Sequence, residues 1–226
     1  FDAVVLACGM GAVPKLGIEG EDLPGVWDAL DFIERAKLGR DVGVLGSRVA
    51  VIGAGNTAID ALTCSKRLSP GSRVTCYYRR GAAQMTAYAF EYAFAKQEGI
   101  EFRFFAAPAR ILGNGRVEAM EFAQTGADAK PTGETFVEPV DTVIRAIGQN
   151  RLLAEIEALG VAHDGGVVRV DESLATSVPG VFAAGDCIFE KGAGEAMVVE
   201  AAEQGKVAAR SVDRYLLGTT SKAASL

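Results

Sequence analysis

Short runs of apolar residues recur along the chain and predict buried strands. Five such runs contain few charged residues. In four of the five, a glycine follows within two residues of the end of the run. The runs span residues 3–7, 48–52, 74–78, 143–147 and 181–184. Such runs are typical of strands in a parallel sheet that is covered on both faces.

Apolar residues at helical spacing separate these runs and predict three helices. The helices are expected at residues 27–38, 87–97 and 195–217. Strands that alternate with helices indicate βαβ units. We therefore predict an α/β fold built on a parallel sheet.

A second group of strands is expected to pair in the antiparallel sense. These strands span residues 100–105, 110–112, 117–122 and 136–140. Asn114-Gly115 lies between two of them and predicts a hairpin turn. The stretch 123–135 is rich in Gly, Ala, Thr and Lys and is expected to form an exposed loop.

The composition of the chain argues against several classes of binding partner. The 226 residues are 49% hydrophobic and 23% charged, and the net charge is −6. This acidic balance argues against binding to nucleic acid or to a membrane surface, and no run approaches the roughly 18 apolar residues of a spanning helix. The four cysteines include no C-x-x-C pair, and His163 is the single histidine, so we expect no metal site. Free cysteines fit a reducing cytosol, where we place the protein.

The first residues already read as a strand, without an initiating methionine or a leader. We therefore expect the chain to be a fragment, cut just before an element of a domain that begins upstream of Phe1. Composition also suggests boundaries near Leu45-Gly46 and near Gln149-Asn150.

Residues 53–58, Gly-Ala-Gly-Asn-Thr-Ala, form a G-x-G-x-x-A motif between a predicted strand and a predicted helix. Gly53 permits a tight turn, Gly55 lets a pyrophosphate approach the backbone, and Ala58 lets the helix pack closely. The helix beginning at Asn56 directs free N–H groups at the phosphates. A glycine-rich turn of another α/β protein is the alternative, but the strand–turn–helix context favours dinucleotide binding.

Arg79 and Arg80 follow the next strand, where an NAD site usually carries an acidic residue for the ribose hydroxyls. Two guanidinium groups can bind a 2′-phosphate, which a carboxylate would repel. The alternative is that both arginines are merely solvated. The motif before them favours NADPH over NADH.

Gly185 and Asp186 follow another buried run, at the sheet edge where open α/β folds bind ligands. Asp186 could accept hydrogen bonds from a polyol such as a ribityl chain, although by itself a turn cap is the simpler interpretation. A long helix after residues 192–194 offers an N-terminus that could stabilise a reduced flavin. Cys187 has no resolving partner in the sequence and is interpreted as a packing residue.

The order of these motifs resembles the two-dinucleotide flavoprotein reductases of the pyridine nucleotide-disulfide oxidoreductase superfamily. The resemblance covers residues 1–218 and adds Val-Ile-Arg-Ala-Ile-Gly-Gln and Gly-Val-Phe-Ala-Ala-Gly-Asp to the motif at residues 53–58. It is closest to the small subunit of glutamate synthase and the electron-input subunit of dihydropyrimidine dehydrogenase. It implies a Rossmann-like NADPH domain, residues 46–148, inserted into an incomplete FAD-binding α/β domain made of residues 1–45 and 149–226.

The resemblance also assigns roles to residues. Those that would hold the NADPH pyrophosphate and 2′-phosphate are Gly53, Gly55, Asn56, Thr57, Ala58, Arg79 and Arg80. Gly148 would lie where the chain passes between domains near the dinucleotides. Those that would contact FAD are Gly9, Gly185, Asp186, Ala196, Met197 and Val198.

The sequence departs from the family pattern in three places. Cys8 stands where the family usually has Thr, and Thr86 stands where it often has Pro. The motif that holds the ADP half of FAD and the cysteine-rich region that holds 4Fe–4S clusters are absent, and both are expected upstream of Phe1.

We therefore expect an NADPH-dependent flavoprotein oxidoreductase that passes hydride to FAD and electrons onward to iron–sulfur centres and a partner subunit. One alternative is a flavin-dependent reductase or monooxygenase of the same superfamily with another acceptor. A thioredoxin-reductase-like enzyme would need a dithiol in the nucleotide domain, and Cys64 and Cys76 have the wrong spacing. A further alternative is a non-catalytic nucleotide-binding fragment, since without its ADP-binding strand the fragment should hold FAD poorly.

Overall fold

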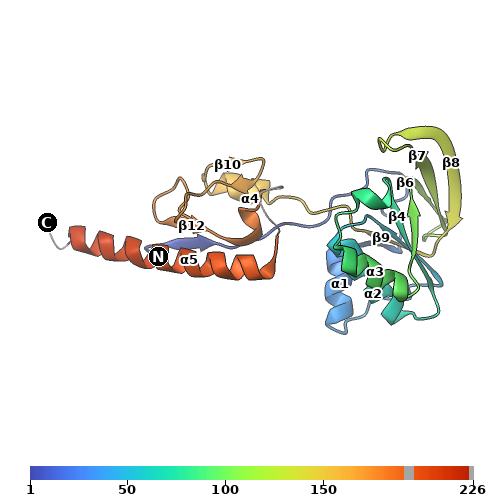
Figure 1. Ribbon diagram of the computed structural model, residues 1–226, viewed down its shortest axis with the longest axis horizontal. Helices are drawn as coiled ribbons and strands as arrows, with labels where there is room; N and C mark the ends of the chain where they lie inside the picture. Colours follow the sequence, from blue (N-terminus) through green and yellow to red (C-terminus); the bar gives the residue numbers. More distant parts are fainter. Residues whose placement is uncertain (191–195, 224–226) are drawn as a thin grey trace. The chain divides into compact units, whose positions relative to one another are not determined.

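The computed structural model describes residues 1–190 and 196–223. The chain divides into two compact units, coloured along the sequence in Figure 1. The central unit comprises Ala12–Gln149, and the terminal unit combines Phe1–Gly11 with Asn150–Leu226. The second division coincides with the boundary expected near Gln149-Asn150. The first lies at Gly11–Ala12 instead of Leu45-Gly46, because residues 12–45 contribute a strand, a helix and core side chains to the central unit.

A five-stranded parallel sheet forms the centre of the central unit, in the order β2-β9-β3-β4-β5. These strands are β2 (Val26–Asp28), β9 (Thr142–Arg145), β3 (Arg48–Ile52), β4 (Arg73–Tyr78) and β5 (Glu101–Phe104). The predicted parallel α/β sheet is thus confirmed. Strand β5 differs from prediction, because it continues the parallel sheet beside β4 and is not part of an antiparallel group.

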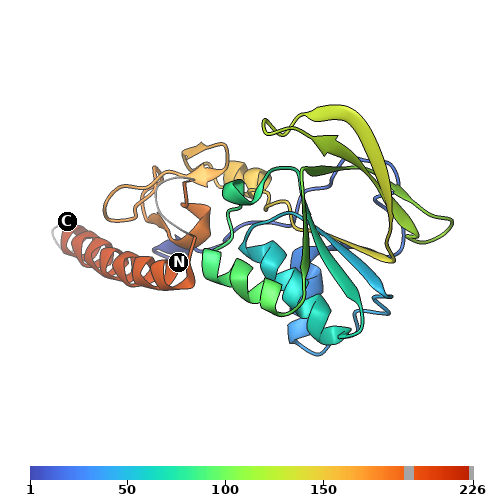
Figure 2. The same cartoon turned by 45° about the vertical axis from the view of Figure 1, so that its right-hand side comes forward.

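Two layers cover this sheet, as Figure 1 and Figure 2 show. Helices α1 (Ala29–Lys37), α2 (Asn56–Leu68) and α3 (Ala89–Gln97) lie on one face, with the 3-10 turn η1 (Ala82–Gln84) before α3. Along β3, Val49 and Val51 point into the helical core, whereas Ala50 and Ile52 point into the opposite core. This alternation follows from the two-residue period of a strand and explains why β3 is apolar throughout.

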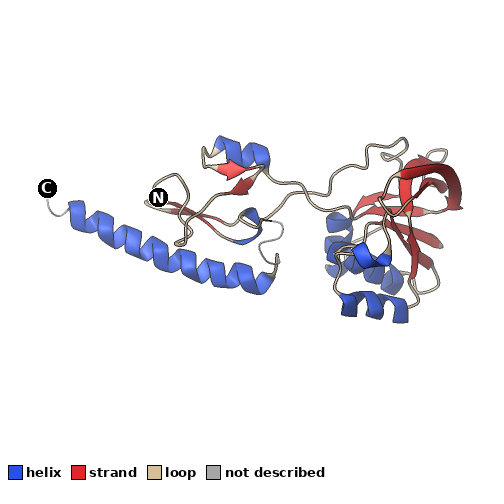
Figure 3. Cartoon of the chain, turned by 45° about the horizontal axis from the view of Figure 1, so that its top comes forward, coloured by secondary structure: helices blue, strands red, loops and turns tan. Residues whose placement is uncertain are grey.

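An antiparallel three-stranded sheet forms the other layer (Figure 3). Its strands are β6 (Ala106–Leu112), β7 (Ala119–Thr125) and β8 (Pro131–Pro139). The turn predicted at Asn114-Gly115 connects β6 to β7, and Gly115 has a φ of +80°. The ring of Phe122 stacks on Tyr77 of the parallel sheet with centroids 4.1 Å apart.

The stretch 123–135 is not a loop, contrary to expectation. It contains the end of β7, a turn closed by the Gly126 N–H donating to the Lys130 carbonyl at 2.9 Å, and the start of β8. Its polar composition has a physical cause: β8 is an edge strand whose first five residues are all exposed. Edge strands often carry polar residues, which discourage pairing with other chains.

The start of α1 also differs from the predicted helix at residues 27–38. Trp27 belongs to β2, and the helix begins after Asp28, whose carboxylate accepts from the Leu30 N–H at 2.7 Å. An N-cap of this type satisfies amides that the first helical turn leaves open.

The terminal unit is built around two short pairs of strands. Parallel strands β1 (Val4–Leu6) and β12 (Val181–Ala183) form one pair, and β10 (His163–Asp164) with β11 (Val167–Val168) forms the other. The remaining elements are α4 (Leu153–Ala158), the 3-10 turn η2 (Gly185–Cys187) and the long helix α5 (Val198–Ala223). Val4 and Val5 are 44% and 42% exposed, so the expectation that β1 is fully buried is wrong for this chain. In the described part of the chain, β1 has β12 as its single partner strand.

Among residues 1–190 and 196–223, no helix has the length and apolar character to cross a membrane.

Candidate functional site

The turn between β3 and α2 requires glycine at position 53. Gly53 has a φ of +127°, a conformation that side chains disfavour. A Cβ atom there would lie 2.1 Å from the carbonyl oxygen of Ala146, which belongs to the chain leaving β9. The Gly53 N–H donates to the Tyr77 carbonyl at 3.0 Å, which ties the turn to β4. The fold therefore holds this turn tightly against its neighbours.

The N-terminus of α2 is open to an anion. Gly55 is its N-cap and supplies no capping side chain, and the first turn contains no acidic residue. The leading N–H groups of a helix have no partner within the helix and, with the helix dipole, attract negative charge. Ala58, one turn into the helix, is completely buried, so the helix packs closely behind the turn.

A second segment, which follows η1, is hydrogen-bonded to the Gly53–Ala58 turn. The N–H groups of Thr86 and Ala87 donate to the Ala54 carbonyl at 3.3 and 3.1 Å. The Asn56 side chain accepts from the Tyr88 N–H at 3.1 Å. Asn56 thus clamps this segment to the start of α2, a structural role that the sequence did not indicate.

Arg79 and Arg80 directly follow β4, which is the parallel neighbour of β3. The carboxyl ends of adjacent parallel strands meet at one sheet edge, so the two arginines and the Gly53–Ala58 turn share that edge. Both side chains are exposed, while the Arg79 carbonyl accepts from the Thr125 hydroxyl and the Arg80 carbonyl accepts from the Phe105 N–H. Within the described residues, neither guanidinium forms an ion pair with a carboxylate.

Gly148 lies three residues beyond β9, on the chain that leaves the same sheet edge. Its φ is +106°, and a Cβ there would meet nothing within 4 Å. The backbone conformation therefore explains glycine at this position, and the space beside it is open.

Cys76 lies on β4 beneath the turn. It is fully buried, and its thiol donates to the Gly53 carbonyl at 3.1 Å. Burial raises its pKa to about 12, so the group stays a neutral thiol at physiological pH. It acts as a packing and hydrogen-bonding residue behind the turn.

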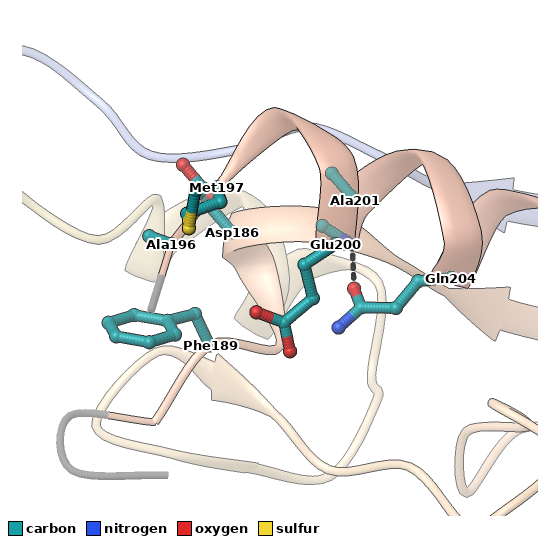
Figure 4. Close-up of a pocket in the computed structure, with 8 residues that line it drawn as sticks. Asp186, Phe189, Ala196, Met197, Glu200, Ala201 and Gln204 are labelled. Atoms are coloured by element: carbon teal, nitrogen blue, oxygen red, sulfur yellow. Dashed lines mark hydrogen bonds between the residues drawn. The ribbon is translucent and has the colours of Figure 1, made fainter. Parts of the chain in front are cut away.

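The terminal unit contains a second cluster, at the junction of β12, η2 and α5. Gly185 has a φ of +78°, and its N–H donates to the Gln204 side chain at 2.7 Å. Figure 4 shows this hydrogen bond together with Asp186, Ala196 and Met197, which line the same small hollow. The Asp186 carboxylate is half-buried and accepts no hydrogen bond from any residue that the structure describes.

Four further residues line this hollow and were not predicted: Phe189, Glu200, Ala201 and Gln204. The spacing of Met197, Glu200 and Gln204 could have revealed two of them, because residues three, four and seven apart share a helix face. Arg151 fixes the turn from behind, donating to the carbonyls of Asp186 and Phe189 at 2.7 and 2.6 Å.

The remaining predicted residues of the terminal unit lie outside this hollow. Val198 is 88% exposed and does not line it. Gly9 has a φ of +67° and lies in the irregular segment after β1. The helix begins at Val198 and not directly after residues 192–194, which lie outside the described residues.

Comparison with known families gives one match over most of the chain. A family described as pyridine nucleotide-disulphide oxidoreductase matches residues 1–205. Among curated proteins, the NADP(+)-dependent formate dehydrogenase subunit beta of Moorella thermoacetica is 36% identical over 98% of this chain and 33% of its own length. The glutamate synthase [NADPH] small chain of Escherichia coli is 32% identical over 96% of this chain and 51% of its own length.

Solved structures resemble the fold of this chain. The thioredoxin reductase of T. acidophilum has a TM-score of 0.77 and 24% identity, covering 96% of this chain and 66% of that chain. Mycobacterium tuberculosis FprA in complex with NADPH has a TM-score of 0.70 and 20% identity, covering 99% of this chain and 65% of that chain. The chain spans a third to a half of the two curated relatives described above.

Proposed function

Because the chain belongs to the pyridine nucleotide-disulphide oxidoreductase family, we propose that its central unit binds NADPH and its terminal unit supplies part of an FAD site. On this proposal, the whole protein is an NADPH-dependent flavoprotein oxidoreductase. It passes electrons onward to iron–sulfur centres that lie outside this chain, and from there to a partner subunit.

The observation that carries the proposal is the pairing of an open helix N-terminus with two cationic side chains at one sheet edge. The α2 N-terminus can accept a pyrophosphate, because Gly55 has no side chain that could cap its leading amides. Arg79 and Arg80 follow the adjacent strand and are exposed. Guanidinium groups favour a phosphorylated ribose over one with free hydroxyls.

In the terminal unit, the Asp186 side chain, and not the Gly185 amide, is the group that can bind a flavin cofactor. That amide already donates to Gln204. The Asp186 carboxylate remains available to accept hydrogen bonds from a polyol, which is the chemistry of a ribityl chain. Met197 and Ala196 add an apolar wall beside it.

The chemistry of hydride transfer would be supplied by the two cofactors when bound. The residues of this chain bind and orient: Gly53 and Gly55 let phosphate approach the backbone, and Arg79 holds the 2′-phosphate. Positioning of this kind is how proteins accelerate cofactor reactions. A partner subunit is supported by the names of the two curated relatives, a formate dehydrogenase subunit beta and a glutamate synthase small chain.

The proposal is tested by titrating the 226-residue chain with NADPH and with NADH in a calorimeter. We expect Arg79→Ala to weaken NADPH binding about 10- to 100-fold, the range for loss of a charge-assisted hydrogen bond. Binding of NADH, which lacks the 2′-phosphate, should change less than about two-fold.

The matched control is Arg116→Ala, which removes the same charge from an exposed residue in the β6–β7 turn. It should leave both affinities unchanged. An equal loss of NADPH and NADH binding in Arg79→Ala would contradict the assignment of the 2′-phosphate. Failure of the unaltered chain to bind either nucleotide would contradict the nucleotide site itself.

A further inference from the structure

Cys8 and Cys187 belong to opposite ends of the sequence but meet in the terminal unit. Strand β1 pairs with β12 in parallel, with Leu6 opposite Ala183. Cys8 comes two residues after Leu6, and Cys187 closes the η2 turn that follows β12. The Cys187 thiol lies 3.5 Å from the Leu6 carbonyl oxygen, two residues before Cys8, and Cys8 is near enough to contribute to the raised pKa of Cys187.

The two thiols differ in access. Cys8 is exposed and precedes Gly9, where a Cβ would meet nothing within 4 Å. Cys187 is fully buried in the small core of the terminal unit. A small oxidant can therefore reach Cys8 from solvent. Cys187, in the core of the terminal unit, can then react with the oxidised Cys8.

We propose that Cys8 and Cys187 form a reversible disulfide when the chain meets a low-molecular-weight disulfide such as oxidised glutathione. The geometry suits such a bond, because the pairing of β1 with β12 brings the segments after both strands together and places the Cys187 thiol 3.5 Å from the carbonyl oxygen of Leu6, two residues before Cys8. This inference does not depend on any bound cofactor.

The reaction balances in two exchanges. The Cys8 thiolate attacks glutathione disulfide, forms a mixed disulfide and releases one glutathione thiolate. The Cys187 thiolate then attacks the Cys8 sulfur, forms the Cys8–Cys187 bond and expels the second glutathione thiolate. The two protons lost by the protein thiols are taken up by the departing thiolates. Two protein thiols are oxidised, and one glutathione disulfide is reduced to two glutathione molecules.

The second exchange is expected to be the slow one. Burial, followed by the nearby Cys8, raises the pKa of Cys187 to about 11. Because the thiolate is the attacking species, little of Cys187 is reactive at neutral pH. The glutathione adduct on Cys8 should therefore appear first and then decline as the internal disulfide forms.

The disulfide would join the segment that contains Gly9 to the η2 turn that contains Asp186. On the proposed function both segments face FAD, so the disulfide would then lie beside the FAD site. Only this consequence rests on the proposed function. Formation of the bond can be measured without FAD, so its failure and the failure of the proposed function are separate results.

The test uses the 226-residue chain, native oxidation with glutathione disulfide, and mass spectrometry of tryptic peptides. The peptides to follow contain residues 1–15 and 170–191, each with one cysteine. The unaltered chain should give these two peptides linked to each other. Cys187→Ala should stop at a glutathione adduct on Cys8, and Cys8→Ser should leave Cys187 unmodified because it is buried.

Cys64→Ser is the control, since Cys64 lies on α2 in the central unit and should not affect the linkage. If Cys187→Ala does not fold by circular dichroism, the unaltered chain still decides the question through its linked peptide. A stable adduct on Cys8 without the linked peptide would overturn the proposal. Linkage of Cys8 to Cys64 or Cys76 in place of Cys187 would overturn it as well.

Discussion

Alanine at Gly53 and alanine at Gly55 are expected to have opposite consequences, although both glycines belong to one turn. At Gly53 the added methyl would lie 2.1 Å from the Ala146 carbonyl oxygen and 2.8 Å from its carbon. Both atoms are backbone and cannot rotate away. At Gly55 the added methyl would lie 3.2 Å from the Thr86 hydroxyl oxygen, which can shift by a few tenths of an ångström.

The stability cost follows from these distances. Gly53→Ala combines a backbone conformation that costs about 1–3 kcal/mol for other residues with an overpacking cost of about 1–3 kcal/mol. Their sum, roughly 2–6 kcal/mol, corresponds to a fall in Tm on the order of 10–20 °C for a unit of this size. Gly55→Ala has an ordinary extended conformation, with φ −95° and ψ −180°, so its cost should stay within about 1 kcal/mol.

The effect on ligand binding should run the other way. Gly55→Ala places a methyl group where a pyrophosphate would approach the α2 amides, and we expect NADPH binding to weaken at least about ten-fold, or roughly 1.4 kcal/mol. Scanning calorimetry measures Tm, and titration calorimetry measures affinity. Gly71→Ala is the matched control, because Gly71 is exposed and a Cβ there would meet nothing within 4 Å.

Two results would refute this reasoning. If Gly53→Ala melts within a few degrees of the unaltered chain, the contact with Ala146 does not constrain the turn. If Gly55→Ala keeps its fold and binds NADPH with unchanged affinity, phosphate does not approach the backbone at this position. The first result concerns the fold and the second concerns the ligand, so each can fail alone.

Two carboxylates should give opposite pH profiles in thermal melts. Asp141 accepts hydrogen bonds from Arg48 and Ser47, and chiefly the bond with Arg48 lowers its pKa to about 2. Because the pKa is lower in the folded protein, Asp141→Asn should reduce the free energy of unfolding at pH 7 by about 1–2 kcal/mol, allowing for solvent screening. This difference should disappear as the pH falls from about 4 to about 2. An unchanged difference at pH 2 would contradict the ion pair as its source. Burial, followed by Asp60, raises the pKa of Glu91, and one of its carboxylate oxygens is buried without a partner among the described residues. Glu91→Gln should therefore be at least as stable as the unaltered chain at pH 7 and lose that advantage below about pH 4, and a less stable variant at pH 7 would oppose this interpretation.

The turn between β3 and α2 could be located from the sequence because its determinants are local. An apolar strand, a glycine pair and the start of a helix occupy consecutive residues, and each has its own conformational preference. Trp27 was predicted in a helix but lies in β2, which shows that apolar spacing alone does not fix where a helix begins. Trp27 in β2 and Phe32 in α1 contact the same core, so their spacing fits either element, and the Asp28 cap decides where the helix begins.

Strand β8 could not be identified from composition, for a different physical reason. Its exposed residues face solvent on an edge, so they need not alternate in hydrophobicity. Only pairing with β7, which aligns Phe136 with Phe122, makes the segment a strand. Such pairing is a tertiary contact that a single segment does not encode.

The position of Cys187 shows why spacing in the sequence does not predict contacts between residues that are far apart in the chain. A redox pair is usually sought as two cysteines a few residues apart, and by that rule Cys187 had no partner. The parallel pairing of β1 with β12 joins segments from opposite ends of the chain, and the η2 turn then directs Cys187 back toward the strand that precedes Cys8. The same topology brings the segment after β1, which contains Gly9, near the η2 turn, which contains Asp186. A change at Cys8 is therefore expected to report on the neighbourhood of Asp186, and no local pattern in the sequence connects the two.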